Sequence, residues 1–282
     1  MNVVEITKKL TKIYPINIIF KLVIKYDYIY IGLINVMNLL KIIPISIKKN
    51  NGIYQVNDGN QIIFITRKNR LVRYLSGIDN AMNSLACAYH LNKINFSKDD
   101  VVIDIGANVG ELSLWLSRQG VNQVYSYEPD KVEYSALAKN CEKNPNIVPF
   151  QMAMFSTVGK MKLYSDNKNG DSGLIFSGRY EEEYEVDVAT LDCMINELGL
   201  KKIKVLKIEA EGAEPEILYG ISVDMLKRIE YITIDCGPER GLDKEYTLIP
   251  CVNLLLKNKF EIKEINYQRM SVLFYNSINY LN

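Results

Sequence analysis

Acidic and glycine residues meet at a predicted strand-to-helix junction. In the stretch VVIDIGANVG, Asp104 lies in an apolar run two residues before a glycine turn, and the helix-like run ELSLWLSRQG follows. Such a turn commonly binds a small molecule, because free backbone N–H groups and the helix dipole converge there. Asp104, Gly106, Asn108 and Gly110 are therefore candidate ligand-binding residues.

A second acid closes the next predicted strand. Glu128 ends the run VYSYE, where a carboxylate can accept hydrogen bonds from both hydroxyls of a ribose. Pro129 follows it directly, and Ala153 ends the third predicted strand of the sheet. We include Glu128, Pro129 and Ala153 in the predicted cofactor site.

Two kinds of ligand share these features. A dinucleotide needs G-x-G-x-x-G, whereas the glycines here are spaced G-x-x-x-G, with no second glycine where a pyrophosphate must approach the backbone. A ligand with an adenosine but no phosphates fits better, and a positive charge on it would suit Asp104. S-adenosylmethionine has these parts, since it joins adenine and ribose to a sulfonium with an amino acid tail. The remaining interpretation is a structural glycine turn beside a surface Glu128.

Four ordered motifs carry a resemblance to a known family. VVIDIGANVGELSLWL, VYSYEP, VDVATLD and VLKIEAEGAEPEIL resemble the FkbM family of S-adenosylmethionine-dependent methyltransferases, over about Asp100 to Tyr219. The family commonly reads K-I-D-x-E-G-A-E in the last motif, and Glu209 stands here in place of that aspartate. The resemblance implies a class I methyltransferase fold and methylation of a hydroxyl on a sugar or a natural product.

The chemistry of methyl transfer selects further candidates. Acceptor oxygen, methyl carbon and sulfur must lie in line, and a group must remove the hydroxyl proton. Glu209 and Glu211 follow the fourth parallel strand, and Asp235 closes the next one, so we take them as catalytic candidates with the only histidine, His90. The alternative for Glu209 and Glu211 is a structural role in the loop, and the alternative for His90 is packing or helix capping. Glu209 and Asp235 could also share a divalent metal, but carboxylates alone do not specify one, and metal use stays open.

The loop that follows Asp235 is predicted to contact the substrate. It reads CGPERGLDK, and a charged loop with glycines at a strand end is more typical of ligand contact than of packing. Glu239 and Arg240 are the candidates, with a solvated turn and an internal ion pair as the alternative. We expect Glu214 in the first turn of the next helix, where the dipole favours an acid.

Alternating elements from Asp100 onward predict the fold class. The pattern indicates an α/β, Rossmann-like doubly wound sheet with parallel strands and right-handed crossovers. FEIKEIN and SVLFYN have no helix between them, which predicts an antiparallel pair at the sheet edge. The expected elements are strands at 101–105, 123–127, 147–153, 204–208 and 229–234, and helices at 111–118, 131–143, 214–219 and 247–258, with a strand-rich insert after 153.

The first hundred residues differ in composition from the rest. We divide the chain into an apolar, basic helical segment (1–50), a hairpin around Asn57-Asp58-Gly59 with a helical lead-in (51–99), and the methyltransferase domain (100–282). Residues 1–50 hold eight lysines and two acids, a net charge of +6, whereas the whole chain has +1. This asymmetry indicates an anionic partner, and we predict peripheral contact with a membrane and a lipid-linked glycan acceptor. The competing account is an α-helical lid or dimer surface that packs the apolar faces within the protein.

Charge and cysteine content narrow the function classes. For the run 28–47, which contains Lys41 and Pro44, we favour helices packed within the protein over an interfacial helix, and least of all a transmembrane span. The five cysteines lack paired spacing, so we expect reduced thiols and a cytoplasmic protein, at the inner face of the membrane if residues 1–50 bind it. The near-neutral charge argues against a nucleic-acid partner. A methyltransferase of a non-sugar natural product or a protein, and a non-catalytic cofactor-binding protein, are the alternatives. The oligomeric state is open.

Overall fold

A computed structural model of the chain describes residues 26–166, 172–175, 182–237 and 245–280. Contacts between residues divide the chain into two compact units, and the division falls between Met82 and Asn83, within helix α4 (Ile78–Ala88). The sequence-based division at residues 50 and 99 lies elsewhere.

The N-terminal unit contains a helix and a small antiparallel sheet. Its elements are α3 (Asp27–Leu39), β1 (Ser46–Asn50), β2 (Ile53–Asn57), β3 (Ile62–Ile65) and the 3₁₀ helix η1 (Lys68–Tyr74), with strand order β1-β2-β3. Strands β2 and β3 confirm the predicted hairpin. None of the described helices is long and apolar enough to cross a membrane.

The helical prediction up to residue 47 is wrong in its last part. Helix α3 ends at Leu39, and Pro44, which cannot continue a helix, precedes strand β1. Ile45 and Ile47 are buried while Lys48 is exposed, so the run alternates with the period of a strand. This short alternation was hidden by the apolar residues that precede it.

The C-terminal unit is built on a seven-stranded sheet with the order β13-β14-β12-β11-β4-β5-β6. The parallel strands are β4 (Val101–Ile105), β5 (Gln123–Tyr127), β6 (Ile147–Phe150), β11 (Ile203–Ile208) and β12 (Ile229–Asp235). These runs are almost continuously apolar because helices cover both faces of the sheet. The order confirms the predicted doubly wound class, with a switch point between β4 and β11.

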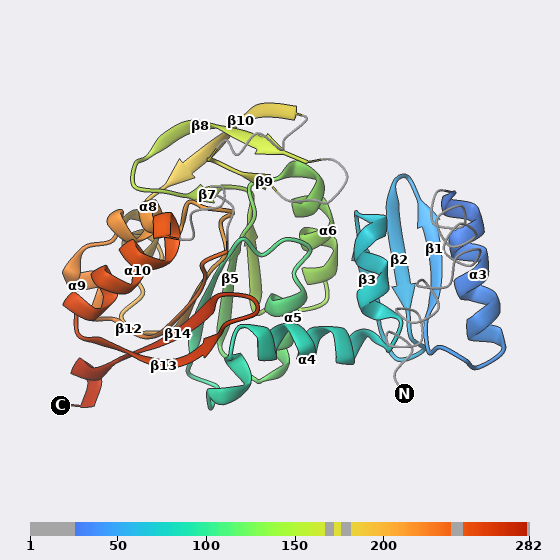
Figure 1. Cartoon of the computed structure of the whole chain (residues 1–282), viewed down its shortest axis with the longest axis horizontal. Helices are drawn as coiled ribbons and strands as arrows, with labels where there is room; N and C mark the ends of the chain where they lie inside the picture. Colours follow the sequence, from blue (N-terminus) through green and yellow to red (C-terminus); the bar gives the residue numbers. More distant parts are fainter. Residues whose placement is uncertain (1–25, 167–171, 176–181, 238–244, 281–282) are drawn as a thin grey trace. The chain divides into compact units, whose positions relative to one another are not determined.

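Helices lie on both sides of this sheet. Helices α5 (Glu111–Arg118) and α6 (Lys131–Cys141) lie on one side, and α8 (Glu214–Tyr219), α9 (Val223–Leu226) and α10 (Glu245–Lys257) lie on the other (Figure 1). Helices α7 (Leu191–Glu197) and α9 were not predicted; Thr190 caps α7 by accepting a hydrogen bond from the Cys193 amide. A single continuous core of buried residues joins α7, α8, α9 and α10 to the sheet.

The last two strands confirm the predicted antiparallel pair. Strand β13 (Phe260–Asn266) forms the edge of the sheet, and β14 (Ser271–Asn276) lies between it and β12, antiparallel to both. The register pairs Ser271 with Asp235, so the turn between β13 and β14 lies at the carboxyl end of the parallel strands. A residue in this turn can therefore reach the ligand-facing edge.

The strand-rich insert forms a sheet of its own. The predicted strand 147–153 is broken, because β6 ends at Phe150 and the chain then leaves the main sheet. The second sheet has the order β7-β10-β8-β9, from β7 (Ala153–Met154), β8 (Gly159–Ser165), β9 (Ser172–Gly173) and β10 (Glu182–Ala189). It lies at the top of the C-terminal unit in Figure 1, at the end of the main sheet from which β6 leads into β7. The insert therefore lies at the edge of the sheet where the candidate residues converge.

Candidate active site

The glycine turn lies where the ends of β4 and β11 touch. Gly106 has φ +71°, and a Cβ placed on it would lie 1.8 Å from the Glu209 carbonyl oxygen. Gly110, at the start of α5, has φ +91°, and a Cβ there would lie 2.7 Å from Cδ1 of Leu137. The close approach of a backbone oxygen thus requires a glycine at position 106, and the positive φ favours one at position 110, where the Leu137 methyl group can move.

The backbone amides of the turn are bonded within the protein. The amides of Gly106 and Ala107 donate to the carbonyl of Tyr127 at 2.9 and 3.0 Å, and the amide of Asn108 donates to Oε2 of Glu128 at 2.8 Å. Our expectation of free N–H groups is therefore wrong for these three residues. The turn is a rigid frame that is tied to the end of β5.

Glu128 is the carboxylate that this frame holds. It is 4% exposed, and its Oε1 accepts a second hydrogen bond from the amide of Asp130 at 2.9 Å, across Pro129. Burial raises the pKa of Glu128 to about 8. Each carboxylate oxygen can accept a further hydrogen bond, so the residue fits two ribose hydroxyls.

The insert sheet covers the segment that follows Glu128. Asp130 caps helix α6 by accepting from the Val132 amide at 2.8 Å, and Ser165 of β8 donates to its other oxygen at 2.7 Å. The ammonium of Lys131 lies 4.6 Å from the ring centroid of Tyr184 in β10. These contacts contribute to the burial of the carboxylate segment.

Asp104 faces a cation of the protein. It is fully buried; its Oδ1 lies 3.1 Å from Nζ of Lys207, and Ser113 donates to its Oδ2 at 2.7 Å. Lys207 also donates to the carbonyls of Ile105 and Gly106, at 3.0 and 2.8 Å. Asp104 therefore lies behind the turn, where its charge is balanced by Lys207, and not in the open position that we expected to meet the positive charge of a cofactor.

Glu209 and Asp235 are brought together by an arginine from the β13–β14 turn. Arg269 donates to Oε1 of Glu209 at 2.7 Å and, through Nε, to Oδ2 of Asp235 at 2.8 Å. It also donates to the hydroxyl of Tyr89 at 2.5 Å and stacks over its ring, with the guanidinium carbon 4.6 Å from the centroid. The other oxygen of Glu209 lies 3.3 Å from Nζ of Lys207.

The charges in this cluster do not cancel. The carboxylates of Asp104, Glu209 and Asp235 surround the cations of Lys207 and Arg269, which leaves an excess of one negative charge within this set. Burial raises the pKa of Asp235, and the charge of Glu209 raises it further against the opposing effect of Arg269. Burial alone would lower the pKa of Lys207, but the neighbouring carboxylates outweigh it and the pKa is raised.

Comparison with known proteins shows the family of this chain. A family profile described as the methyltransferase FkbM domain matches residues 104–248, just over half of the chain, and these residues hold Asp104, Glu128, Glu209 and Asp235. The chain belongs to the FkbM methyltransferase family. It is therefore an S-adenosylmethionine-dependent methyltransferase with a class I, Rossmann-like fold.

The individual relatives are only distantly similar to the chain in sequence. The chain is similar to the methyltransferase sdnD of Sordaria araneosa, 24% identical over 199 residues that cover 58% of this chain and 74% of the relative. It is also similar to the 2-O-methyltransferase NoeI of Sinorhizobium fredii, 23% identical over 210 residues that cover 68% and 86%. Among solved structures it is similar to Aeropyrum pernix fibrillarin with bound S-adenosyl-L-methionine, at 16% identity, 83% and 99% coverage and a TM-score of 0.42.

Sequence reasoning missed three residues of this FkbM-family site. Lys207 lies inside the fourth motif, directly before Ile208, but a lysine in a buried strand gave no sign of its partners. Tyr89 follows α4, outside the family motifs. Arg269 had a usable signal, because the predicted antiparallel pair places the turn between its strands at one edge of the sheet.

His90 supports the packing alternative. It is buried with φ +60°, and its Nε2 lies 3.3 Å from the carbonyl oxygen of Ser271, to which it must donate because a carbonyl cannot. The neighbouring hydroxyl of Ser271 donates to the Ala88 carbonyl. His90 thus ties the lead-in segment to β14, next to Tyr89.

The loop after Glu209 is shaped by Glu214. This residue opens α8, as predicted, and its Oε1 accepts hydrogen bonds from the amides of Ala210 and Gly212 at 2.7 and 3.3 Å. Glu211 is partly buried and has φ +49°, a conformation uncommon for a non-glycine residue. Glu214 thus fixes the backbone that presents Glu209 and Glu211.

The remaining candidate residues lie apart from the charged cluster or outside the residues that the structure describes. Ala153 packs in the core of the insert sheet with residues such as Leu163 and Val188. Glu239 and Arg240 lie outside the described residues. Within the described ranges, no group of three or more His, Cys, Asp or Glu side chains is arranged to hold a metal ion. A guanidinium, from Arg269, is what joins Glu209 to Asp235.

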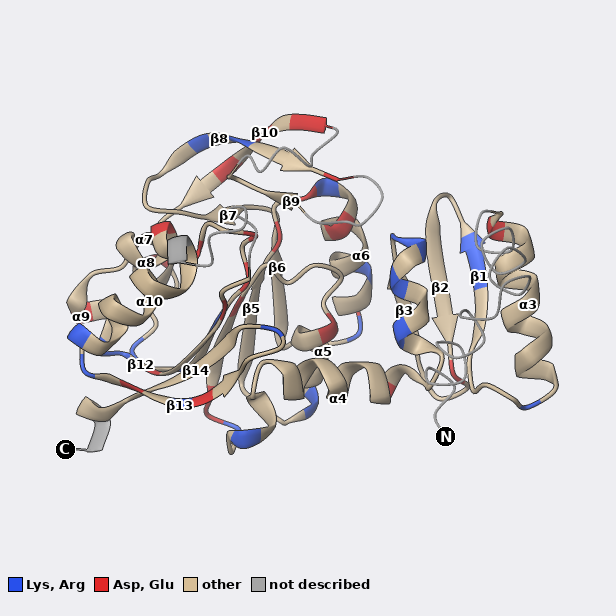
Figure 2. Ribbon diagram, viewed as in Figure 1, with Lys and Arg blue, Asp and Glu red and all other residues tan. Residues whose placement is uncertain are grey.

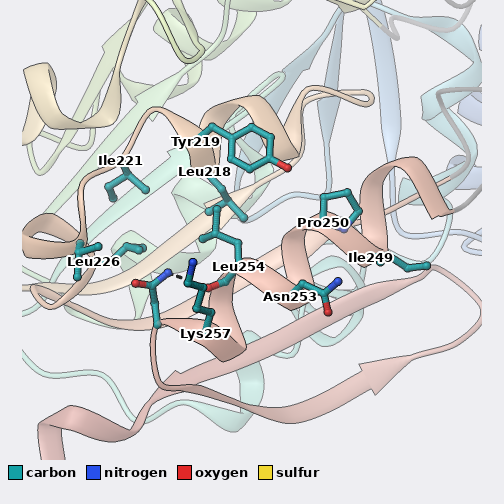
Figure 3. A pocket seen from close by; sticks show the side chains of 11 residues that line it. Leu218, Tyr219, Ile221, Leu226, Ile249, Pro250, Asn253, Leu254 and Lys257 are labelled. Atoms are coloured by element: carbon teal, nitrogen blue, oxygen red, sulfur yellow. Dashed lines mark hydrogen bonds between the residues drawn. The ribbon is translucent and has the colours of Figure 1, made fainter.

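A hollow of about 600 Å³ lies elsewhere in the C-terminal unit. Helices α8, α9 and α10 line it, with residues such as Tyr219, Ile249 and Lys257 (Figure 3). It contains none of the site residues above. We therefore place the candidate active site at the carboxyl ends of the parallel strands, beside the charged cluster of Glu209, Asp235 and Arg269, and not in this hollow.

Proposed function

We propose that the chain transfers a methyl group from S-adenosylmethionine to a hydroxyl oxygen of a sugar or glycan. The observation that carries this proposal is the pairing of Glu209 with Asp235 at the ligand-facing edge, through Arg269. Two relatives support transfer to oxygen by their names, the 2-O-methyltransferase NoeI and the 31-O-demethyl-FK506 methyltransferase FkbM of Streptomyces tacrolimicus. The family resemblance supports a sugar among the possible acceptors.

The chain's residues fit the cofactor. S-adenosylmethionine supplies a methyl group on a positively charged sulfonium. Glu128 would hold the ribose, because its buried carboxylate is oriented by two backbone amides and keeps capacity for two further hydrogen bonds. The excess negative charge of the Asp104, Glu209 and Asp235 cluster favours a cationic ligand nearby.

Asp235 is the better base of the two edge carboxylates. Its pKa is raised by burial and by Glu209, and a carboxylate with a raised pKa holds a proton more readily. Both oxygens of Glu209 instead contact cations, at 2.7 Å for Arg269 and 3.3 Å for Lys207. We therefore place the acceptor's hydroxyl proton on Asp235 and give Glu209 a positioning role.

The acceptor is further proposed to be lipid-linked and reached in the cytoplasm. The basic N-terminal segment, with a net charge of +6 over residues 1–50, supports an anionic, membrane-proximal substrate. All five cysteines are free thiols, which suits a reducing compartment.

The test is methyl transfer from isotopically labelled S-adenosylmethionine to a panel of acceptors. The panel holds free sugars, glycans, lipid-linked glycans, a polyketide alcohol and an unrelated protein, and mass spectrometry locates the label. The expected product carries the label on a sugar oxygen. Label on the polyketide or the protein alone would overturn the acceptor class.

Variants test the assignment of the base. Asp235→Asn should lower turnover at least about a hundredfold while the cofactor still binds, since general-base catalysis contributes typically that much or more. The matched control is Asp224→Asn, a surface carboxylate whose side chain is 84% exposed. Full turnover in Asp235→Asn would show that another group takes the proton.

A further inference from the structure

Helix α3 presents an apolar surface to its surroundings. Its inner side packs on the N-terminal unit through buried Tyr30 and Ile34, and Asn35 exchanges two hydrogen bonds with the backbone of Ile47 in the edge strand β1, at 2.9 and 2.7 Å. The residues on its opposite side are exposed and carry no charge. They are Tyr28, Ile29, Gly32, Leu33, Val36, Leu39 and Leu40, which we call the α3 outer face.

The exposure of this face is large. Leu39 is 80% exposed and Tyr28 is 73% exposed, and the apolar surface continues past the helix to Ile42, at 55%. Scattered exposed apolar residues are ordinary, but a continuous set along one helix marks a surface that contacts an apolar partner. A helix in contact with water alone would carry polar residues on that side.

The charges around the α3 outer face are positive. Helix α3 has no charged residue except Asp27 at its start, and Lys41 follows two residues after its end. The helix is accordingly tan along most of its length in Figure 2. Asp27 is engaged by Lys68 at 2.7 Å, by the hydroxyl of Tyr54 at 2.7 Å and by Lys49. Lys41 and Lys48 are exposed. Overall, residues 26–82 hold seven lysines and arginines against three acids.

We infer that the α3 outer face docks on an anionic lipid surface, with the helix lying in the interface. Uncharged apolar residues along one helix side, with exposed Lys41 just past its end and a positive excess over residues 26–82, match the boundary between acyl chains and anionic headgroups. At thirteen residues, α3 is too short to span a bilayer, so it would lie along the surface. A second copy in this place would bring the positive charges of two chains together, whereas Asp27, the one acid of α3, already pairs with Lys49 and Lys68.

The proposal concerns the N-terminal unit and does not depend on methyl transfer. It is tested by co-sedimentation of the full-length chain with phosphatidylcholine vesicles, with and without phosphatidylserine, at low and high salt. The chain should sediment with the anionic vesicles at low salt. Binding should weaken at high salt, because the attraction of exposed lysines is screened, and should be weaker on neutral vesicles.

Substitutions test whether vesicle binding depends on the α3 outer face or on nonspecific hydrophobic contact. Leu33→Ser combined with Val36→Ser and Leu39→Ser should weaken vesicle binding by about tenfold or more, since three inserted apolar side chains are lost. The matched control is Val158→Ser with Tyr219→Ser, which removes exposed apolar residues of the C-terminal unit, 65% and 61% exposed, and should leave vesicle binding unchanged. Circular dichroism and cofactor binding check that both variants are folded.

Two results would overturn the proposal. One is a full-length chain that stays in the supernatant with both kinds of vesicle at low salt. The other is a dimer, seen by light scattering, that the triple serine variant dissociates while vesicles bind neither protein, because a second copy would then cover the face. Neither result bears on the acceptor assay, so failure here is distinguishable from failure of the proposed function.

Discussion

Replacement of Arg269 by methionine is the sharpest test of the charged cluster. The change keeps much of the aliphatic stem and removes the guanidinium that joins Glu209 to Asp235. It leaves two carboxylates close together and deprives the hydroxyl of Tyr89 of its 2.5 Å contact. We expect loss of both stability and turnover.

The magnitude follows from the contacts. Each hydrogen bond to a charged group contributes about 1.5–3 kcal/mol, so the two carboxylate bonds set a ceiling of about 3–6 kcal/mol. The side chains of Arg269 and Glu209 are each 29% exposed, and water replaces part of what is lost. We therefore expect Arg269→Met to lower the free energy of unfolding by about 2–4 kcal/mol near neutral pH.

The sign of the pH dependence gives a second readout. Arg269 lowers the pKa of Asp235, so its removal raises the folded-state pKa of this carboxyl further above its unfolded value. Between those two values the folded variant binds more protons than the unfolded one, and its stability falls as pH rises. The deficit relative to the unmodified protein should thus be larger near pH 8 than near pH 5.

Urea denaturation at these two pH values measures the deficit, with Lys227→Met as a control. Lys227 pairs with Asp224 on the surface, and its loss should leave the stability nearly unchanged, because water and salt screen an exposed pair. Adding Glu209→Gln and Asp235→Asn to Arg269→Met should restore part of the stability, because the two carboxylates that lost the guanidinium are then uncharged. Equal deficits at both pH values, with no recovery in the combined variant, would refute the reasoning.

Three further outcomes are expected. Gly106→Ala should lower the free energy of unfolding by more than about 3 kcal/mol, because its Cβ would lie 1.8 Å from a carbonyl oxygen. The control Gly120→Ala, at a glycine with positive φ but open space, should cost about 1–2 kcal/mol. Similar losses for the two variants in thermal denaturation would contradict the close approach. Lys207→Met should cost about 3–5 kcal/mol by leaving Asp104 buried without its cation, and Asp104→Asn in the same chain should recover part of that; a recovery of zero would argue against their ion pair. Calorimetry should show cofactor affinity rising by up to about tenfold per pH unit towards pH 8, the pKa of Glu128, with weak and pH-independent binding in Glu128→Gln; a flat profile in the unmodified chain would remove Glu128 from the ribose site.

Local sequence patterns were sufficient for most of the C-terminal fold. Strands such as Val101–Ile105 and Gln123–Tyr127, and the helix Glu111–Arg118, have the predicted bounds, because buried parallel strands are short apolar runs and the helices between them begin and end at clear signals. Prediction failed where no clear signal set an element apart from its neighbours. Strand β1 follows directly on an apolar run with a helical pattern, and helix α7 has only seven residues, about two turns.

The candidate site was likewise predicted only in part. The edge residues Glu128, Glu209 and Asp235 were found from the sequence, because each closes a strand and parallel strands share one edge. The contacts of those carboxylates could not be predicted from the sequence. Arg269 lies 60 residues beyond Glu209 and Tyr89 lies 180 residues before Arg269, so only folding brings them into one cluster.

The sequence by itself determined the family, the sheet and the positions of the acids, because these depend on motifs and periods within short stretches of chain. The tertiary structure decided the environment of each acid. Asp104 looked like a ligand for a cationic cofactor until Lys207, from a neighbouring strand, proved to be its partner. The properties of a carboxylate depend on burial and on charges within a few ångströms, and residues far apart in the chain supply both.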